Sequence, residues 1–167
     1  MSLTEKDSQY LWHPYTQHKT ASAPIAITKG KGALLWDENG KEYIDAIASW
    51  WVNPYGHSNT FIADAIYKQL TTLEHVLFGG FTHEPAVKVA EKLLAILPQN
   101  QQKLFFSDNG STAVEIAIKV ALQYFFNKGE KRTTIIAFEN AFHGDTFAAM
   151  AASGISLFTD AFQGMFI

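Results

Sequence analysis

Five polar residues and a glycine, Ser107 to Thr112, form the segment of this sequence best suited to binding an anion. They follow an apolar run and precede a stretch with helical periodicity, so they lie where a strand passes into a helix. The first turn of a helix offers free N–H groups and a partial positive charge, and both favour a phosphate. Gly110 lets the backbone approach such a ligand closely, and Ser111 adds a hydroxyl donor. Helix capping by the same residues is the alternative. The segment is not a nucleotide P-loop, because the second glycine and the lysine of that pattern are missing.

A second group of candidate side chains follows the next apolar run, in the segment Asn140 to Thr146. Phe142 can stack on a planar cofactor. His143 is a candidate base, since imidazole titrates near neutral pH, but a structural hydrogen bond is the commoner role of a single histidine. Asp145 belongs either to the same site or to the cap of a helix that begins at Thr146.

The adjacent tryptophans Trp50 and Trp51 are a third candidate. Successive side chains of a strand point to opposite faces, so the two cannot both be buried on one face. We expect one of them to line a pocket or an interface. No metal site is expected, because the chain lacks cysteine and its histidines lack ligand spacing such as His-x-x-x-His.

The elements that position these side chains begin with a small antiparallel sheet. An Asn-Gly pair at residues 39–40 lies between apolar runs at 33–36 and 42–46, which is typical of a β-hairpin. Residues 25–28 are a candidate third strand. Residues 1–22 are expected to form an irregular arm.

Three helices are predicted from apolar residues that recur three and four positions apart. They span about 61–73, 85–97 and 113–127. Asn59 or Thr60 is expected to cap the first helix. Pro98 is expected to end the second and Gly129 the third.

The third helix lies between two short apolar runs, 103–106 and 133–138, so the order strand–helix–strand predicts a βαβ unit and a parallel sheet. Within that helix, Glu115 and Lys119 are predicted to form an i,i+4 ion pair. Two strands cannot close a core alone, so we expect partner strands from sequence outside these 167 residues. The apolar end of the chain likewise suggests that it has been cut short.

The composition is that of a globular protein, with 47% apolar and 17% charged residues. The net charge of −3 argues against a nucleic-acid partner. The first residues are polar rather than signal-like, and no stretch approaches the roughly 20 apolar residues that span a bilayer. We therefore expect a cytoplasmic protein without a membrane partner.

Five segments, spread over nearly the whole chain, together resemble the class III aminotransferases, enzymes that depend on pyridoxal phosphate. The matching segments are Trp12-His13-Pro14-Tyr15, Ser49-Trp50-Trp51, His75 to His83, Asp108 to Glu115 and Phe142 to Thr146. The last two patterns occur across that family. The first three are more specific to its branch in biotin biosynthesis, which moves an amino group from S-adenosylmethionine to 8-amino-7-oxononanoate.

The resemblance implies an α/β fold, the PLP-dependent transferase fold type I of aspartate aminotransferase, incomplete in this chain. Residues 1–50 would form an N-terminal arm and a β segment of the small domain, and 51–167 the start of the large cofactor-binding domain. Gly110 and Ser111 would hold the cofactor phosphate, and Phe142 would stack on the pyridine ring.

The resemblance also implies substrate-binding roles for Trp51, Tyr15, Phe142 and Asp145. Trp51 would line the substrate pocket, and Tyr15 would recognise the keto-acid substrate. Asp145 would belong to the hydrogen-bonded groups near Tyr15. Phe142 replaces the tyrosine usual in the family, so the hydrogen bond of that phenol is absent or comes from elsewhere. A homodimer with active sites at its interface, acting on small molecules, is implied as well.

No catalytic residue is predicted within this chain. The resemblance places three groups beyond residue 167: the lysine that binds the cofactor, the aspartate at its ring nitrogen and the arginine for the substrate carboxylate. The 167 residues alone are therefore expected to be inactive. Three alternatives stay open: a class III aminotransferase that uses pyruvate or an ω-amino acid, a non-catalytic fragment, and a nucleotide-binding domain that uses the Gly110 loop.

Overall fold

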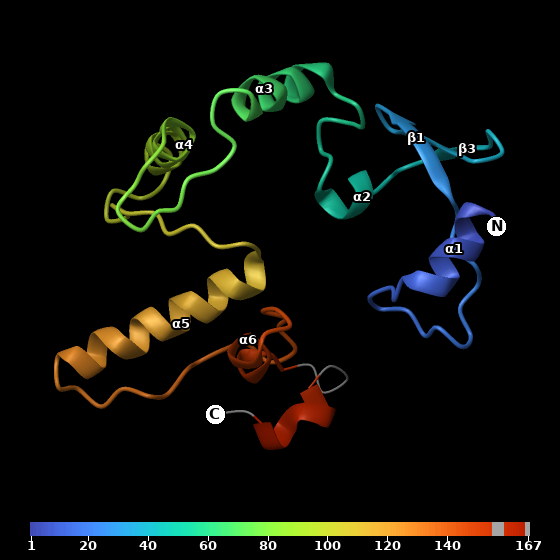
Figure 1. Cartoon of the computed structure of the whole chain (residues 1–167). Helices are drawn as coiled ribbons and strands as arrows, with labels where there is room; N and C mark the ends of the chain where they lie inside the picture. The colour runs from blue at the N-terminus through green and yellow to red at the C-terminus, as the bar shows by residue number, and fades with distance from the viewer. Residues whose placement is uncertain (155–158, 166–167) are drawn as a thin grey trace. The chain divides into compact units, whose positions relative to one another are not determined.

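Contacts within the chain divide the computed structural model into two compact units, Met1–Thr82 and His83–Ile167. The structure describes residues 1–154 and 159–165. In Figure 1 the first unit runs from blue to green and the second from yellow-green to red. A division by contacts within this chain does not test where the domains of a longer protein meet, so the domain boundary expected near residue 50 stays a prediction.

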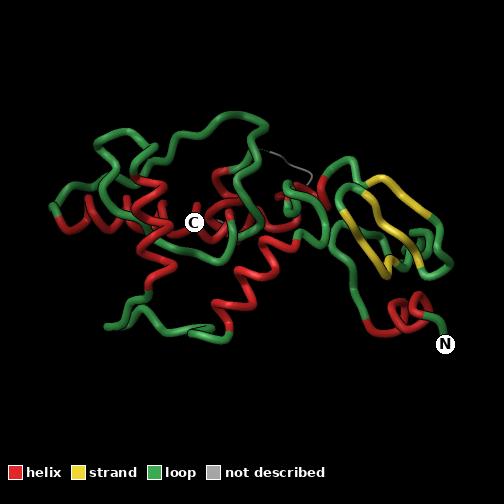
Figure 2. Tube along the Cα trace, turned by 90° about the horizontal axis from the view of Figure 1, so that it is seen from above, coloured by secondary structure: helices red, strands yellow, loops and turns green. Residues whose placement is uncertain are grey.

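The first unit contains an antiparallel sheet of three strands, which confirms the predicted hairpin and its third strand. Its strands are β1 (Ile27–Lys31), β2 (Leu34–Asp37) and β3 (Glu42–Ile44), paired in that order. Figure 2 shows them side by side in yellow. Leu34 pairs with Lys31 of β1 and with Ile44 of β3, so β2 is the central strand. Gly40 in the turn has a φ of +81°, which glycine adopts without steric strain.

The carboxylate of Asp37 holds the hairpin turn. It accepts hydrogen bonds from the amides of Asn39 and Lys41 and from the hydroxyl of Tyr43, each at 2.9 Å. Burial raises the pKa of Asp37, but the hydrogen bonds from Lys41, Tyr43 and Asn39 outweigh it and keep this pKa below its usual value.

The helices of the first unit are α1 (Leu3–Tyr10), α2 (Ala48–Trp51) and α3 (Thr60–Leu70). Asn59 caps α3 as predicted, since its side chain accepts a hydrogen bond from an amide of the first turn. The prediction of an irregular arm over 1–22 is wrong for its first part. Ser2 and Glu5 form a capping box that starts α1: the Ser2 hydroxyl accepts the Glu5 amide, and the Glu5 carboxylate accepts the Ser2 amide.

The second unit is helical. Its elements are α4 (Glu84–Leu94), α5 (Gly110–Asn127), α6 (Phe147–Ala152) and the 3₁₀ helix η1 (Asp160–Met165). α4 ends three residues before the predicted end at Leu97. The chain tightens there, since the Ile96 amide donates to the Leu93 carbonyl, and the residue before Pro98 is disfavoured in a helix.

The end of α5 confirms the prediction for Gly129. This glycine has a φ of +73°, its amide donates to the Phe126 carbonyl, and the Glu130 amide donates to the Phe125 carbonyl. These two bonds are the Schellman pattern, which satisfies carbonyls at the end of a helix.

The predicted strands at 103–106 and 133–138 are wrong for this structure, and so is the βαβ unit built from them. Neither segment pairs as a strand within the described residues. The strands found in those residues are β1, β2 and β3, which form the antiparallel sheet of the first unit. Extended backbone becomes a strand only when a neighbour accepts and donates its hydrogen bonds. The apolar sequence supplies the strand propensity but not the neighbour.

The buried hydrophobic residues among those described are Ala86, Ala149 and Met150. Ala149 and Met150 belong to α6, which packs against α5. Within the residues that the structure describes, no helix has the length and apolar character to cross a membrane. In the same residues, no cluster of three or more histidine or acidic side chains is arranged to hold a metal ion.

Candidate functional site

The N-terminus of α5 carries the predicted phosphate-binding residues. Asn109 caps the helix: its side chain accepts the Thr112 amide at 3.0 Å, and its own amide donates to the Thr112 hydroxyl at 3.2 Å. The amides of Gly110 and Ser111 precede Thr112 in the first turn, where no helix carbonyl lies four residues earlier to accept them. A Cβ built on Gly110 would meet no atom within 4 Å, so the space beside the α-carbon of Gly110 is open.

Ser111 also joins the two polar segments singled out in the sequence. Its hydroxyl donates to the Thr146 hydroxyl and accepts the Thr146 amide, both at 2.9 Å. Gly144 approaches Ser111 so closely that a Cβ there would clash with the Ser111 side chain and backbone. Its φ of +132° is a second reason for glycine at this position. The segment 140–146 therefore lies against the N-terminus of α5.

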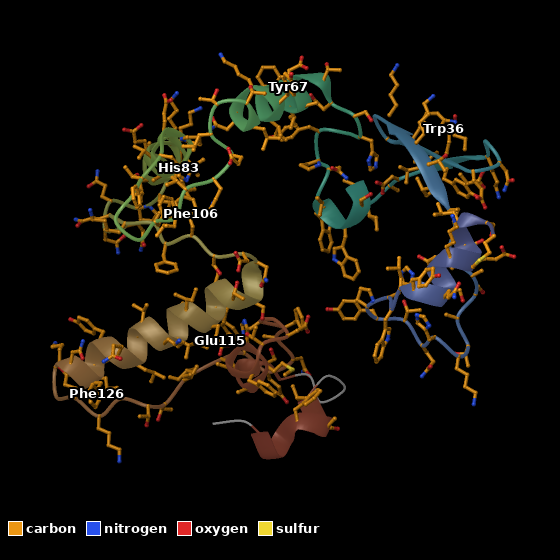
Figure 3. All side chains as sticks on the ribbon, in the orientation of Figure 1. Trp36, Tyr67, His83, Phe106, Glu115 and Phe126 are labelled. Carbon is orange, nitrogen blue, oxygen red and sulfur yellow. The ribbon has the colours of Figure 1, made fainter. Side chains whose placement is uncertain are left out.

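Glu115 fixes this arrangement from the second turn of α5. One of its carboxylate oxygens accepts the Thr146 hydroxyl at 2.7 Å and the amides of Ala148 and Ala149 at 3.1 and 3.3 Å. Figure 3 shows Glu115 where α5 meets α6. A negative charge at the start of α6 is favourable because it satisfies free amides and complements the helix dipole. The predicted ion pair of Glu115 with Lys119 is wrong, since the carboxylate is used on α6.

The other side chains of segment 140–146 have different surroundings. The Phe142 ring is exposed at 50%, which leaves it accessible to a ligand. The His143 backbone amide donates to the Ser153 hydroxyl at 3.0 Å. Asp145 is exposed, and the residue at the N-cap of α6 is Thr146, so Asp145 is not that cap.

The turn α2, which carries the paired tryptophans, is left-handed. Its four residues, Ala48 to Trp51, have φ values of +48°, +47°, +62° and +66°. Left-handed helical backbone costs about 1–2 kcal/mol per non-glycine residue because Cβ crowds the following carbonyl. Several such residues in succession persist only where surrounding contacts hold them.

Those contacts come from Asp45. Its Oδ1 accepts the Ser49 amide at 2.9 Å, and its Oδ2 lies 2.7 Å from both the Ser49 hydroxyl and His57 Nε2. The Asp45 side chain is only 5% exposed. The hydrogen bonds from the Ser49 amide and hydroxyl, and then the one from His57, lower the pKa of Asp45 to about 2.

The turn presents its aromatic rings beside the arm. The ring of Trp50 lies 5.7 Å from that of Tyr15 and 6.4 Å from that of Trp51, which it meets edge-on at 81°. Trp51 is 76% exposed. Tyr15 and the tryptophan pair thus form one aromatic cluster in the first unit, whereas Gly110, Ser111, Phe142 and Asp145 belong to the second unit.

Sequence reasoning missed Asp45, the contact of His57 with it and the cap formed by Glu115. A signal for Glu115 is present in the sequence, because Glu115 ends the segment Asp108 to Glu115, whose pattern occurs across the class III family. Asp45 and His57 are twelve residues apart and only the folded turn brings them together.

A family model described as aminotransferase class-III matches residues 15–166. The chain is 51% identical over 154 residues to the adenosylmethionine-8-amino-7-oxononanoate aminotransferase of Synechococcus elongatus. It is 43% identical over 169 residues to the protein of that name from Staphylococcus aureus. These alignments cover 92% and 98% of this chain but 36% and 37% of the relatives, so the chain spans little more than a third of their length.

Solved structures agree with these relatives. The crystal structure of adenosylmethionine-8-amino-7-oxononanoate aminotransferase from Methanocaldococcus jannaschii matches with a TM-score of 0.94 and 40% identity, over 99% of this chain and 38% of that one. An omega transaminase from Pseudomonas jessenii in complex with PMP matches with a TM-score of 0.90 and 33% identity, over 98% of this chain and 37% of that one.

Proposed function

The chain belongs to the class III aminotransferases, and from that premise we propose that the complete protein transfers an amino group from S-adenosylmethionine to 8-amino-7-oxononanoate. The observation that carries this proposal is the shared name of relatives that are 39–51% identical over 92–98% of the chain. The product would be 7,8-diaminononanoate, a precursor of biotin. Because the chain spans about 37% of those relatives, activity is proposed for the complete protein only.

The cofactor of the proposed reaction is pyridoxal phosphate, and the second unit has groups that suit it. The amides of Gly110 and Ser111 are the donors for its phosphate, at a helix end that favours negative charge. Open space beside Gly110 supports this assignment. The exposed ring of Phe142 is proposed to cover one face of the pyridine ring. The bound cofactor supplies an electron sink for the charge left when the substrate carbon loses its proton.

The proposed substrate-binding residues are Tyr15, Trp51, Phe142 and Asp145. Trp51 supplies a large exposed apolar surface suited to the alkyl chain of the keto acid. Tyr15 is held by ring contact with Trp50, and its hydroxyl is proposed to hydrogen-bond the keto-acid substrate. One pocket must serve two unlike substrates in turn, as in a ping-pong scheme.

A homodimer in the cytoplasm completes the proposal. Exposed aromatic residues support an interface, since aromatic side chains are enriched where subunits meet. Trp12, Trp50, Trp51, Phe61, Phe105 and Phe126 are examples.

The test is amino transfer by the complete protein with pyridoxal phosphate and 8-amino-7-oxononanoate, comparing S-adenosylmethionine with L-alanine as donor. We expect the diamine product, measured by mass spectrometry, from S-adenosylmethionine. The omega transaminase match at 33% identity makes the alternative specific. Product from L-alanine and none from S-adenosylmethionine would overturn the donor assignment while leaving the family in place.

A further inference from the structure

The left-handed turn α2 requires contacts that stabilise it, and one buried carboxylate, that of Asp45, provides them. Four successive non-glycine residues with positive φ do not remain so by local preference. The Asp45 carboxylate accepts both polar hydrogens of Ser49, the second residue of the turn, at 2.9 and 2.7 Å. Ser49 is thereby bound at its backbone and at its side chain by one residue.

Asp45 is itself fixed to the sheet region. Its amide donates to the Ala33 carbonyl at 2.8 Å. The partner of its carboxylate, His57, forms a two-bond bridge with Gly32: the His57 amide donates at 2.8 Å and the His57 carbonyl accepts at 3.0 Å. A Cβ on Gly30 would come within 2.9 Å of His57 side-chain atoms, so glycine there makes room for the imidazole. The carboxylate thus connects the turn to a braced loop.

The group Ser49, His57 and Asp45 is not a hydrolytic triad, although its residue types match one. In a triad the acid and the nucleophile use different nitrogens of the imidazole. Here the Asp45 carboxylate and the Ser49 hydroxyl both lie near Nε2 of His57, at 2.7 and 3.5 Å, and the Ser49 hydroxyl donates its hydrogen bond to Asp45. Asp45, Ser49 and His57 therefore form a structural brace that holds the turn, and Ser49 is not an activated nucleophile.

The turn that the brace holds carries the indoles of Trp50 and Trp51. Trp50 follows Ser49 directly, contacts Tyr15 and lies 6.4 Å from the ring of Trp51. If the turn reverted to right-handed backbone, the directions of both Cβ atoms would change, and the aromatic cluster would lose its arrangement.

We propose that Asp45 is a positioning residue of the aminotransferase, holding the left-handed turn so that Trp51 faces the substrate. The role of Trp51 rests on the proposed function, whereas the position of the indoles does not. Asp45 acts on the substrate through Trp51 and takes no part in the chemical step.

The test compares the complete protein with its Asp45→Ala and Asp37→Ala variants. Asp37 is the matched control, because it also accepts three hydrogen bonds that hold a turn of the same unit, and its partners are Asn39, Lys41 and Tyr43 rather than residues of α2. The first readout is circular dichroism of the coupled indoles, taken as the band that Trp51→Phe removes. The second is the Michaelis constant for 8-amino-7-oxononanoate, measured beside kcat and bound cofactor.

We expect Asp45→Ala to lose the indole band and to raise KM roughly tenfold, with kcat and cofactor content within about twofold of the parent. Asp37→Ala should keep the band and the KM. An unchanged band in Asp45→Ala, or equal losses in both variants, would overturn the proposal. If Asp45→Ala does not fold, Asp45→Asn decides. The side-chain oxygen of asparagine can accept the hydrogen bond of the Ser49 backbone amide, but its NH₂ group cannot accept those of the Ser49 hydroxyl and His57.

The dichroism readout also separates two kinds of failure. A complete protein that forms no diamine but loses the indole band on Asp45→Ala refutes the proposed substrate and supports the brace. Diamine formation together with a band and KM that are indifferent to Asp45 refutes the brace and supports the substrate.

Discussion

The hydroxyl of Ser111 already has hydrogen-bond partners within the chain, so its removal is expected to affect stability more than cofactor binding. It donates to the Thr146 hydroxyl and accepts the Thr146 amide. The Ser111 amide, by contrast, is available at the helix end. The phosphate contact is therefore expected to depend on backbone, and the hydroxyl to stabilise the packing of segment 140–146 on α5.

We predict that Ser111→Ala in the complete protein lowers the free energy of unfolding of the cofactor-free form by about 1–3 kcal/mol, because two hydrogen bonds are lost. Affinity for pyridoxal phosphate, followed by fluorescence titration, should fall less than about tenfold. Thr146→Ala is the comparison variant: it leaves the Ser111 hydroxyl in place but removes its partner hydroxyl and the hydrogen bond from that hydroxyl to Glu115. A loss of affinity far above tenfold with unchanged stability would show direct binding of the phosphate by the hydroxyl.

A second prediction concerns the pH dependence of the unfolding free energy and rests on Asp45. Its pKa is about 2 in the folded protein against 3.8 for the unperturbed carboxyl, so the ionised form stabilises the fold. That contribution is complete above the unfolded pKa and is lost as the pH falls toward the folded value. The difference in unfolding free energy between wild type and Asp45→Asn should be constant from about pH 7 to about pH 5 and should shrink below about pH 4. Urea unfolding at several pH values measures it, and a gap that widens toward low pH would contradict the assignment.

At the scale of elements, the contact between α5 and α6 depends on one carboxylate. We predict that Glu115→Ala destabilises the complete protein by about 1.5–3 kcal/mol, since its hydrogen bonds involve a charged acceptor. Lys119→Ala is the control and should change stability by less than about 0.5 kcal/mol, as expected of an exposed position. Thermal unfolding measures both. Equal losses of stability in the two variants would support the ion pair between Glu115 and Lys119 that the sequence predicted.

Helices and the hairpin could be predicted from the sequence because their signals are local. Asn59, the Asn-Gly turn and Gly129 each act on backbone within a few residues, and each does what its residue type predicts. The resemblance predicted the fold type, and a TM-score of 0.94 to a family structure confirms it.

The predictions of strands at 103–106 and 133–138 were wrong because a strand depends on a signal that is not local. A strand is defined by a neighbour, and no periodicity within the segment supplies one. The left-handed turn at Ala48 to Trp51 could not be predicted either, because its residue types disfavour positive φ and the contacts that hold it come from Asp45 and His57. The cap on α6 lies 31 to 34 residues from Glu115, beyond any local pattern.

At the scale of the whole molecule, the 167 residues leave much apolar surface uncovered. Their accessible surface is 14138 Å², whereas a folded monomeric protein of this mass exposes about 8,000 Å². The aromatic side chains of Phe105 and Phe138 and the aliphatic side chain of Ile136 are mostly exposed. Burial of apolar surface is the main favourable term in folding, so these residues need further protein to cover them.

We predict that residues 1–167 expressed alone show no cooperative thermal transition and bind a hydrophobic dye such as ANS, whereas the complete protein unfolds cooperatively. Calorimetry and dye fluorescence make the comparison. A sharp transition of the fragment near that of the complete protein would mean that these residues bury a core of their own.

The left-handed turn also matters for protein made by chemical ligation. An amino acid of D chirality has its favoured helical region at positive φ, the mirror image of the region open to natural residues. Ala48 has a φ of +48° and only a methyl group to invert. A synthetic segment with D-alanine at position 48 should therefore relieve about 1–2 kcal/mol of backbone strain, whereas the same inversion inside α5 should destabilise that helix by a similar amount.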